Sequence, residues 1–286
     1  MRIPALQVKP MNMERRDTER RHAWAERVWH EIHAGDIQGI LHDGTEFRTG
    51  IEAFSGKPEE GLPQGFHPRP AFDFCRALGI PFHTVVVEQQ PRRYHIGEWS
   101  AGQYTAEEPR VEYGKPGMDR EQFLSWWRHR QPSGQTKPMY EAGKRLQDID
   151  HDLFNAGLAW GLNVDGFILG RHSHRPLAIL EKRVGSASKG NRVESYDPNQ
   201  YFHGTSRRAG DFHAWSRLWE LANSTGARLI LMTFENTDRP ITGIAEIIDV
   251  RREGLTYRDS IRPCDCHFTN DLGGIKDRLR HLLRPL

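Results

Sequence analysis

The chain has 286 residues, of which 37% are hydrophobic and 27% charged, and its formal net charge is +2 at pH 7. This composition is typical of a globular protein with enough residues for one large domain or two smaller ones. It excludes a disulfide-rich scaffold, because there are only three cysteines, and a polybasic coat for nucleic acid. No apolar run is long enough to cross a membrane, and the first residues lack the apolar stretch of a secretory signal. We therefore expect a cytoplasmic protein with no membrane partner.

The first 131 residues predict an N-terminal region of uncertain α+β fold. Apolar residues at helical spacing predict a helix, three successive valines predict a strand with a partner strand after it, and an Asp–Gln capping box predicts a second helix. These elements occupy residues 19–33, 83–88, 94–99 and the segment that begins at Asp119. Residues 36–75, rich in Gly and Pro, match no pattern. We expect residues 1–131 to be a recognition or partner-binding domain.

A second domain is predicted at residues 139–286, after a linker that contains Pro, Ser and Gly. Periodic apolar residues there predict the order helix, strand, strand, helix, strand, strand, helix, which is typical of an α/β or α+β layered fold. The expected elements are residues 139–160, 164–169, 177–183, 211–223, 229–234, 244–250 and 275–283. We detect no internal repeat in the sequence.

Two carboxylates stand out in the predicted hairpin. Asp165 and Glu181 each lie eight positions from Ser173, the centre of a polar turn. If the strands fold back about Ser173, the two side chains lie opposite each other with Cβ atoms about 5 Å apart. Like charges at this separation repel unless a cation lies between them, and one or two carboxylates with waters and phosphate oxygens commonly hold Mg²⁺. We therefore predict that Asp165 and Glu181 bind Mg²⁺ or Mn²⁺.

The two residues after Glu181 are basic and point in opposite directions along the strand. Arg183 shares the face of Glu181, and Lys182 points to the other face. Either cation could hold a scissile phosphate or orient the attacking water beside the metal, so both are catalytic candidates. The structural alternative is that the two carboxylates only form ion pairs, with Arg183 or with arginines of the turn.

This arrangement resembles the PD-(D/E)XK nuclease superfamily over about residues 139–252, and in particular its stand-alone phage and bacterial members. The helix and strand after the hairpin, residues 215–222 and 227–234, resemble the elements that follow the superfamily motif. The resemblance implies a restriction-endonuclease-like core, a mixed central sheet flanked by helices. It also implies a metal-dependent endonuclease or exonuclease that hydrolyses phosphodiester bonds in DNA, in phage biology, defence or DNA repair. Asp165 and Glu181 take the motif acids.

The sequence departs from the superfamily at the motif lysine, because Arg183 occupies that position and Lys182 comes one residue early. Arginine stays protonated and cannot act as a base, although it can hold a phosphate. A catalytically inactive domain that binds nucleic acid or a protein partner is therefore the alternative function. A homodimer is also compatible with the sequence, since two sites would cut both strands of a duplex.

Further candidates surround the hairpin. The helix before it carries Asp152, which could supply another metal ligand or lie on a solvated surface. Basic residues after the hairpin could contact the nucleic-acid backbone. They are Lys189, Arg192, Arg207 and Arg208.

Overall fold

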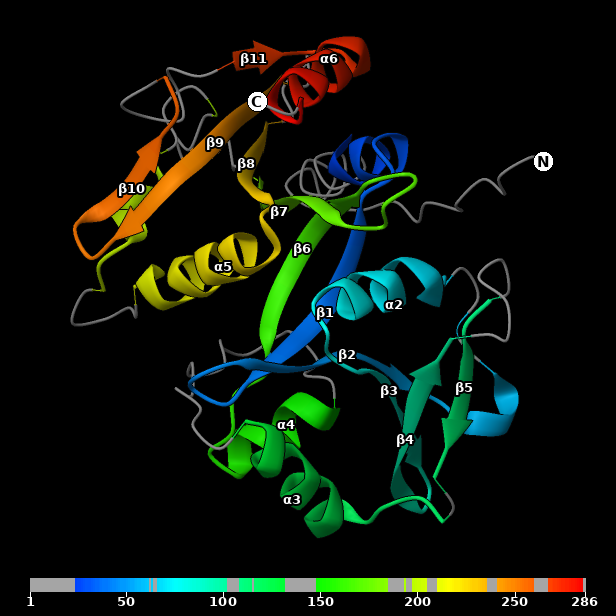
Figure 1. Cartoon of the computed structure of the whole chain (residues 1–286). Coiled ribbons are helices and arrows are strands. Elements are labelled where there is room, and N and C mark those ends of the chain that lie inside the picture. The colour runs from blue at the N-terminus through cyan, green and yellow to red at the C-terminus, as the bar shows by residue number, and fades with distance from the viewer. Residues whose placement is uncertain are drawn as a thin grey trace, which may run out of the picture.

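The chain forms a mixed α/β fold around one open sheet of eleven strands (Figure 1). The computed structural model describes residues 24–61, 63, 66–101, 108–114, 116–131, 148–184, 193, 197–204, 210–235, 241–259 and 267–284. None of the helices in these ranges is long and apolar enough to cross a membrane.

The strands fall into two sequential groups. The first group is β1 (Gly35–His42), β2 (Phe47–Ser55), β3 (Phe82–Gln89), β4 (Arg92–Ser100) and β5 (Arg110–Tyr113). The second group is β6 (Leu162–Leu169), β7 (Pro176–Val184), β8 (Arg228–Glu235), β9 (Ile241–Arg251), β10 (Gly254–Tyr257) and β11 (His267–Thr269). The helices are residues 24–31, α2 (Pro68–Ala77), α3 (Arg120–Arg130), α4 (Asp148–Asn155), α5 (Phe212–Thr225) and α6 (Leu272–Leu282).

The two groups of strands meet in the middle of the sheet, where β1 pairs with β6 in antiparallel orientation. The strand order is β10-β9-β8-β7-β6-β1-β2-β3-β4-β5, with β11 also paired to β9. Only the pairs β2–β3 and β7–β8 are parallel. A parallel pair needs a long crossover connection, and α2 and α5 supply it.

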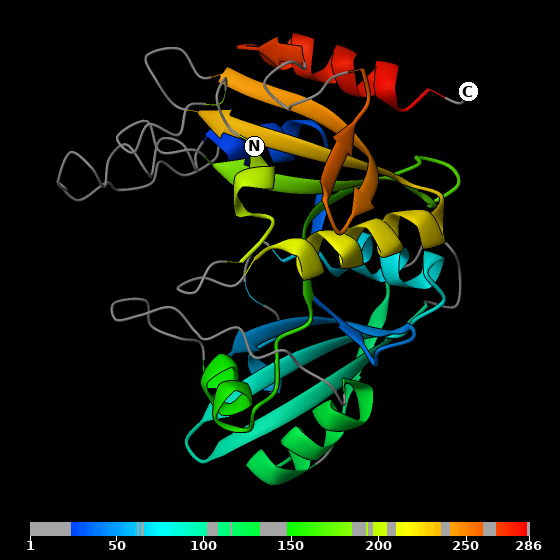
Figure 2. The same ribbon diagram turned by 90° about the vertical axis from the view of Figure 1, so that its left-hand side faces the viewer.

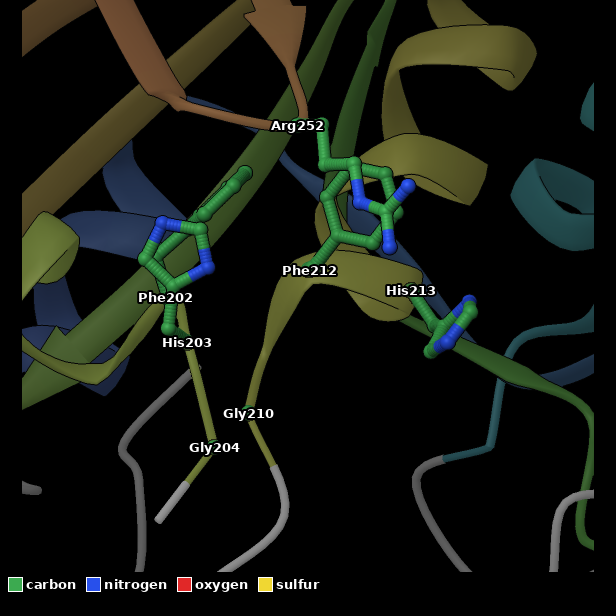
Figure 3. Close-up of a pocket in the computed structure, with 7 residues that line it drawn as sticks. All are labelled: Phe202, His203, Gly204, Gly210, Phe212, His213 and Arg252. Carbon is green, nitrogen blue, oxygen red and sulfur yellow. The ribbon is translucent and has the colours of Figure 1, made fainter.

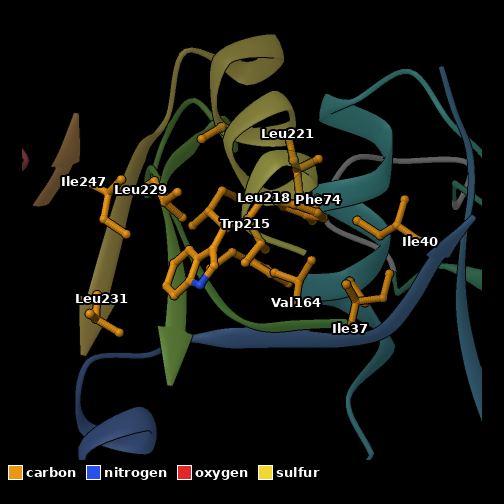
Figure 4. Packing of buried hydrophobic residues seen from close by; sticks show 14 of the residues in the cluster. Ile37, Ile40, Phe74, Val164, Trp215, Leu218, Leu221, Leu229, Leu231 and Ile247 are labelled. Atoms are coloured by element: carbon orange, nitrogen blue, oxygen red, sulfur yellow. The ribbon is translucent and has the colours of Figure 1, made fainter. Parts of the chain in front are cut away.

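Helices cover both faces of the sheet. The crossover helices α2 and α5 share one face and one hydrophobic cluster, to which Phe74 and Trp215 contribute (Figure 4). On the opposite face, the helix at residues 24–31 packs with α6 against β7, β8 and β9. The helices α3 and α4 form a third cluster with β2, β3 and β4. Each half of the sheet is therefore buried on both sides.

Most of the predicted elements are present, and the prediction of an α/β fold with a mixed sheet is confirmed. The helix expected at residues 139–160 differs, because α4 ends at Asn155 and Gly157 follows with a left-handed φ of +68°. Residues 139–147 of that prediction lie outside the described residues. The segment 36–75, which matched no pattern, forms most of β1, β2 and α2.

Packing crosses the expected boundary between residues 131 and 139 in both directions. The helix at residues 24–31 packs with α6 in the second half of the sheet. Conversely, α4 packs with α3 in the first half. The division into two domains stays a prediction, but neither half of the sheet has a core made only of its own segment.

The helix α2 is held at the junction of the two halves by a stack of two phenyl rings. Phe74 of α2 and Phe167 of β6 have ring centroids 4.2 Å apart, and Phe74 is fully buried. We expect Phe74→Ala to lower the free energy of unfolding by about 3–5 kcal/mol, because it removes a buried ring and leaves a cavity. Urea denaturation measures this. Phe154→Ala is the matched control, since that ring is 42% exposed, and it should change stability by less than about 0.5 kcal/mol. Equal losses in both variants would contradict this description of the core.

Candidate functional site

The hairpin of β6 and β7 has the register that the sequence predicts. Gly166 pairs with Leu180 and Ile168 with Ala178, so the strands fold back about Ser173. Asp165 precedes Gly166 on β6 and Glu181 follows Leu180 on β7, so both lie one residue beyond this pair, away from the turn. The register places the two residues on neighbouring strands, but their carboxylates have different partners: Glu181 contacts Arg183, whereas Asp165 contacts Asn163 and the backbone of Lys182. The predicted metal site shared by Asp165 and Glu181 stays a prediction.

Asp165 is fixed at the end of this ladder by three hydrogen bonds. One carboxylate oxygen accepts from the backbone N–H of Lys182 at 3.0 Å, and the other accepts from the Asn163 amide at 2.6 Å. The Asp165 carbonyl accepts from the indole N–H of Trp29 at 2.7 Å. On its other side, β6 shifts register against β1 near this residue. Such an irregularity bends a strand and redirects a side chain, so Asp165 reaches across to the backbone of β7.

Lys182 and two further acids lie on the side of the helix at residues 24–31. The Lys182 ammonium is 2.8 Å from the Glu26 carboxylate and 5.1 Å from the centre of the Trp29 ring. Desolvation raises the pKa of Asp36, the charge of Lys182 opposes this rise, and the charges of Glu26 and Asp165 add to it. The Lys182 ammonium therefore pairs with Glu26 and acts on the charge of Asp36, which Asp165 also affects. We call Glu26, Asp36, Asp165 and Lys182 the acidic cluster.

The Glu181 carboxylate faces α5 and is paired with a cation. Arg183 lies 2.8 Å from Glu181 and 3.6 Å from Asp211, the residue before α5. The Arg183 guanidinium also lies over the Trp215 ring, with 5.6 Å from its central carbon to the ring centre. The predicted division of the strand, with Arg183 beside Glu181 and Lys182 on the opposite face, is confirmed.

The charge balance distinguishes the two faces. Arg183 compensates Glu181 and Asp211, which leaves an excess of one negative charge. Among the described residues the acidic cluster has an excess of two, and the charges of Glu26 and Asp165 add to the rise that desolvation causes in the pKa of Asp36. Because like charges repel, a divalent cation is favoured where the excess of negative charge is larger. Within the described ranges no three His, Cys, Asp or Glu side chains already converge as a metal-binding group.

The structure does not bring Asp152 to the hairpin. Asp152 lies on α4, where Arg92 and Arg120 each approach its carboxylate to 2.8 Å and the Tyr94 hydroxyl donates to it. Although desolvation raises its pKa, these hydrogen bonds and charges together hold the pKa of Asp152 below its usual range. The carboxylate already has its cations, so we leave Asp152 out of the site. The other basic candidates, Lys189, Arg192, Arg207 and Arg208, lie outside the described residues.

A cavity of about 210 Å³ opens beside the first turn of α5 (Figure 3). Aromatic and imidazole rings line it, among them Phe212, His203 and His213, together with Arg252. Because no carboxylate is among its lining residues, this cavity does not compete with the acidic cluster for a cation.

Sequence reasoning missed Glu26 and Asp36, which precede the hairpin by more than a hundred residues. The available signal was modest: Asp36 is an acid at the start of a strand, directly after a predicted helix. Only the pairing of β1 with β6 connects it to Asp165, and that pairing is not encoded in any local pattern.

Comparison of the chain with protein-family models, curated proteins and solved structures finds no match. The functional argument therefore depends on the geometry of this chain.

The contacts of Asp152 predict a structural role with a defined pH dependence. We expect Asp152→Asn to lower the free energy of unfolding by about 1–3 kcal/mol, because two arginines lose their charged acceptor. The folded-state pKa of Asp152 is lowered, so its contribution is complete above the unfolded value of about 4 and is lost as the pH falls through the folded value. Denaturant titrations of both proteins at pH 7 and at pH 3 measure this. A constant difference at the two pH values would contradict the prediction.

Proposed function

We propose that this protein is a metal-dependent nuclease that hydrolyses phosphodiester bonds in DNA, with its catalytic centre at the acidic cluster. The observation that carries the proposal is that the β6–β7 hairpin presents Asp165 beside the backbone of Lys182, whose ammonium pairs with Glu26 and acts on Asp36. A carboxylate group with an excess of negative charge and a neighbouring lysine contains the parts that phosphodiester hydrolysis needs.

The surrounding fold supports this function. The strands β1, β6, β7 and β8 are consecutive neighbours in a mixed sheet, and helices cover both of its faces. A mixed sheet flanked by helices is compatible with the restriction-endonuclease-like core that the sequence resemblance implies. It also has the predicted order of a hairpin with Asp and Glu, then a crossover helix, then a parallel strand.

The donor set of the acidic cluster fits Mg²⁺ or Mn²⁺. Both are hard cations that prefer carboxylate oxygens and are held by one or two carboxylates with waters and phosphate oxygens. Asp165 and Asp36 would hold the ion, and Glu181 is not needed because Arg183 already occupies its carboxylate. When bound, such an ion polarises the scissile phosphate and lowers the pKa of a bound water.

The protein side chains have separate tasks in this proposal. The hydrogen bonds from Asn163 and the Lys182 backbone orient Asp165, so its position costs no reorganisation during the reaction. The Lys182 ammonium stabilises the charge that develops on the phosphate, and Glu26 holds the ammonium beside the site. Lys182 thus takes the role of the motif lysine, although it lies one position early in the sequence.

The test is an incubation of purified protein with duplex and single-stranded DNA in Mg²⁺, Mn²⁺ or EDTA. We expect cleavage with either metal and none in EDTA. Asp165→Asn and Lys182→Met should each lower the rate by about 10²–10³-fold, because each removes one charge that stabilises the transition state. Asp249→Asn is the matched control, since Asp249 lies on β9 and pairs only with its neighbour Arg251 among the contacts described. It should cleave at the wild-type rate.

Two results would revise or reject the proposal. If Glu181→Gln or Arg183→Met lowered the rate as much as Asp165→Asn does, the cation would belong on the α5 face. If the folded wild-type protein cut no DNA with any metal, the alternative of a domain that binds nucleic acid or a protein partner would replace the nuclease, and a gel-shift assay would test it.

A further inference from the structure

The two groups of strands have the same topology. In each group an antiparallel pair is followed by a crossover helix, a parallel strand and another antiparallel strand: β1-β2-α2-β3-β4 and β6-β7-α5-β8-β9. Both crossover helices lie on the same face of the sheet. The last helix of each group, α3 or α6, lies at the outer end of its own half (Figure 2). This shared topology is present although the sequence shows no internal repeat.

The pairing of β1 with β6 fixes a local two-fold axis. The rotation superposes Gly35 on Leu162 and Ile40 on Phe167. It therefore exchanges the paired residues Gly35–Phe167 with the paired residues Ile40–Leu162. The rotation exchanges Ile37 and Val164 with each other, so the axis passes between these two paired residues. The helices on the opposite face obey the same rotation, because residues 24–31 pack on the second half and α4 packs on the first.

Detailed contacts repeat under this rotation. Gln38 is the equivalent of Asp165, and its carbonyl accepts from the indole N–H of Trp160 at 2.7 Å, as the Asp165 carbonyl accepts from Trp29 at 2.7 Å. The Gln38 amide oxygen accepts from the backbone N–H of Ala53 at 3.0 Å, as the Asp165 carboxylate accepts from Lys182 at 3.0 Å.

The glycines repeat as well. A Cβ on Gly39 would lie 2.9 Å from the Trp160 indole nitrogen, and a Cβ on Gly166 would lie 2.6 Å from that of Trp29. Gly79 and Gly226 follow the two crossover helices with φ of +72° and +69°. Four independent features therefore match across the two halves, which is unexpected for a shared topology alone.

The rotation places uncharged residues at the positions equivalent to Asp165, Lys182 and Asp36. Gln38 is the equivalent of Asp165, and Ala53 is the equivalent of Lys182. The equivalent of Asp36 is Asn163. Ala53 is 4% exposed within the third hydrophobic cluster, so this position has no room for an ammonium. Glu52, the equivalent of Glu181, is the one acid retained. Desolvation raises its pKa to about 8, which leaves it neutral at pH 7.

We propose that the chain consists of two copies of one unit about this axis, that only the second copy cuts, and that the enzyme therefore nicks one strand of duplex DNA. The proposal rests on the proposed nuclease function. The strands of a duplex are related by two-fold axes, so two symmetric centres can cut both in one binding event, whereas this chain supplies the symmetry with one centre. Each event breaks one P–O bond and consumes one water, leaving one hydroxyl end and one phosphate monoester end.

The experiment is a time course on supercoiled plasmid with Mg²⁺ or Mn²⁺, resolved on an agarose gel. We expect open circles to accumulate first, and linear molecules to appear only later through independent second nicks. Two pairs of variants at equivalent positions distinguish the contributions of the two copies. Asp165→Ala should leave the plasmid supercoiled, whereas Gln38→Ala should nick within about twofold of wild type. Trp29→Phe should slow nicking and Trp160→Phe should not, because only Trp29 positions the cutting carboxylate.

The outcomes are distinguishable. Linear molecules formed directly from supercoiled plasmid would overturn the single-centre inference and leave the nuclease in place. Equal losses in Gln38→Ala and Asp165→Ala, with unchanged thermal melting, would also overturn it, because the first copy would then contribute to cutting. No conversion of the plasmid by folded protein would reject the nuclease function and the nicking inference together.

Discussion

The pairing of β6 with both β1 and β7 is the constraint on which the rest of the structure depends. Its pairing with β7 sets the hairpin register that places Asp165 next to Lys182 and Glu181. Its pairing with β1 joins the two halves of the sheet and brings Asp36 to the same place. A slip of one residue would turn every β6 side chain to the opposite face, so the buried Val164 and the candidate site are specified together.

The position of the proposed centre is inferred from the balance of charges, because within the described residues no three metal-ligating side chains converge. Glu181 satisfies its charge locally with Arg183, and Asp152 does so with two arginines on the far half of the sheet. Within the described part of the chain the acidic cluster has Lys182 for three carboxylates, and the pKa of Asp36 is raised by desolvation and further by the charges of Glu26 and Asp165. A group of carboxylates whose negative charge exceeds that of the neighbouring lysine is suited to binding a divalent cation.

Local patterns in the sequence were sufficient for elements with strong periodicity. The valine run gave β3, the capping box gave the start of α3, and the equal spacing about Ser173 gave the hairpin register. What no local pattern contains is the long-range pairing of β1 with β6, and with it the roles of Glu26 and Asp36. The internal repeat was also hidden, because its copies share backbone contacts and a few glycines while their charged residues differ. The segment 36–75 matched no pattern for a related reason: its strands are buried on both faces, so polar and apolar residues do not alternate regularly along them.

The central claim, that the acidic cluster holds a divalent cation, is tested most directly by calorimetric titration of Mn²⁺ into the protein without DNA. The account predicts binding that is lost in Asp165→Asn and in Asp36→Asn and retained in Asp249→Asn. Because the pKa of Asp36 is raised, the affinity should begin to fall at a higher pH than for an ordinary aspartate, as protons compete with the ion. Binding that survives Asp165→Asn unchanged, or the absence of binding by the folded wild-type protein, would contradict the account.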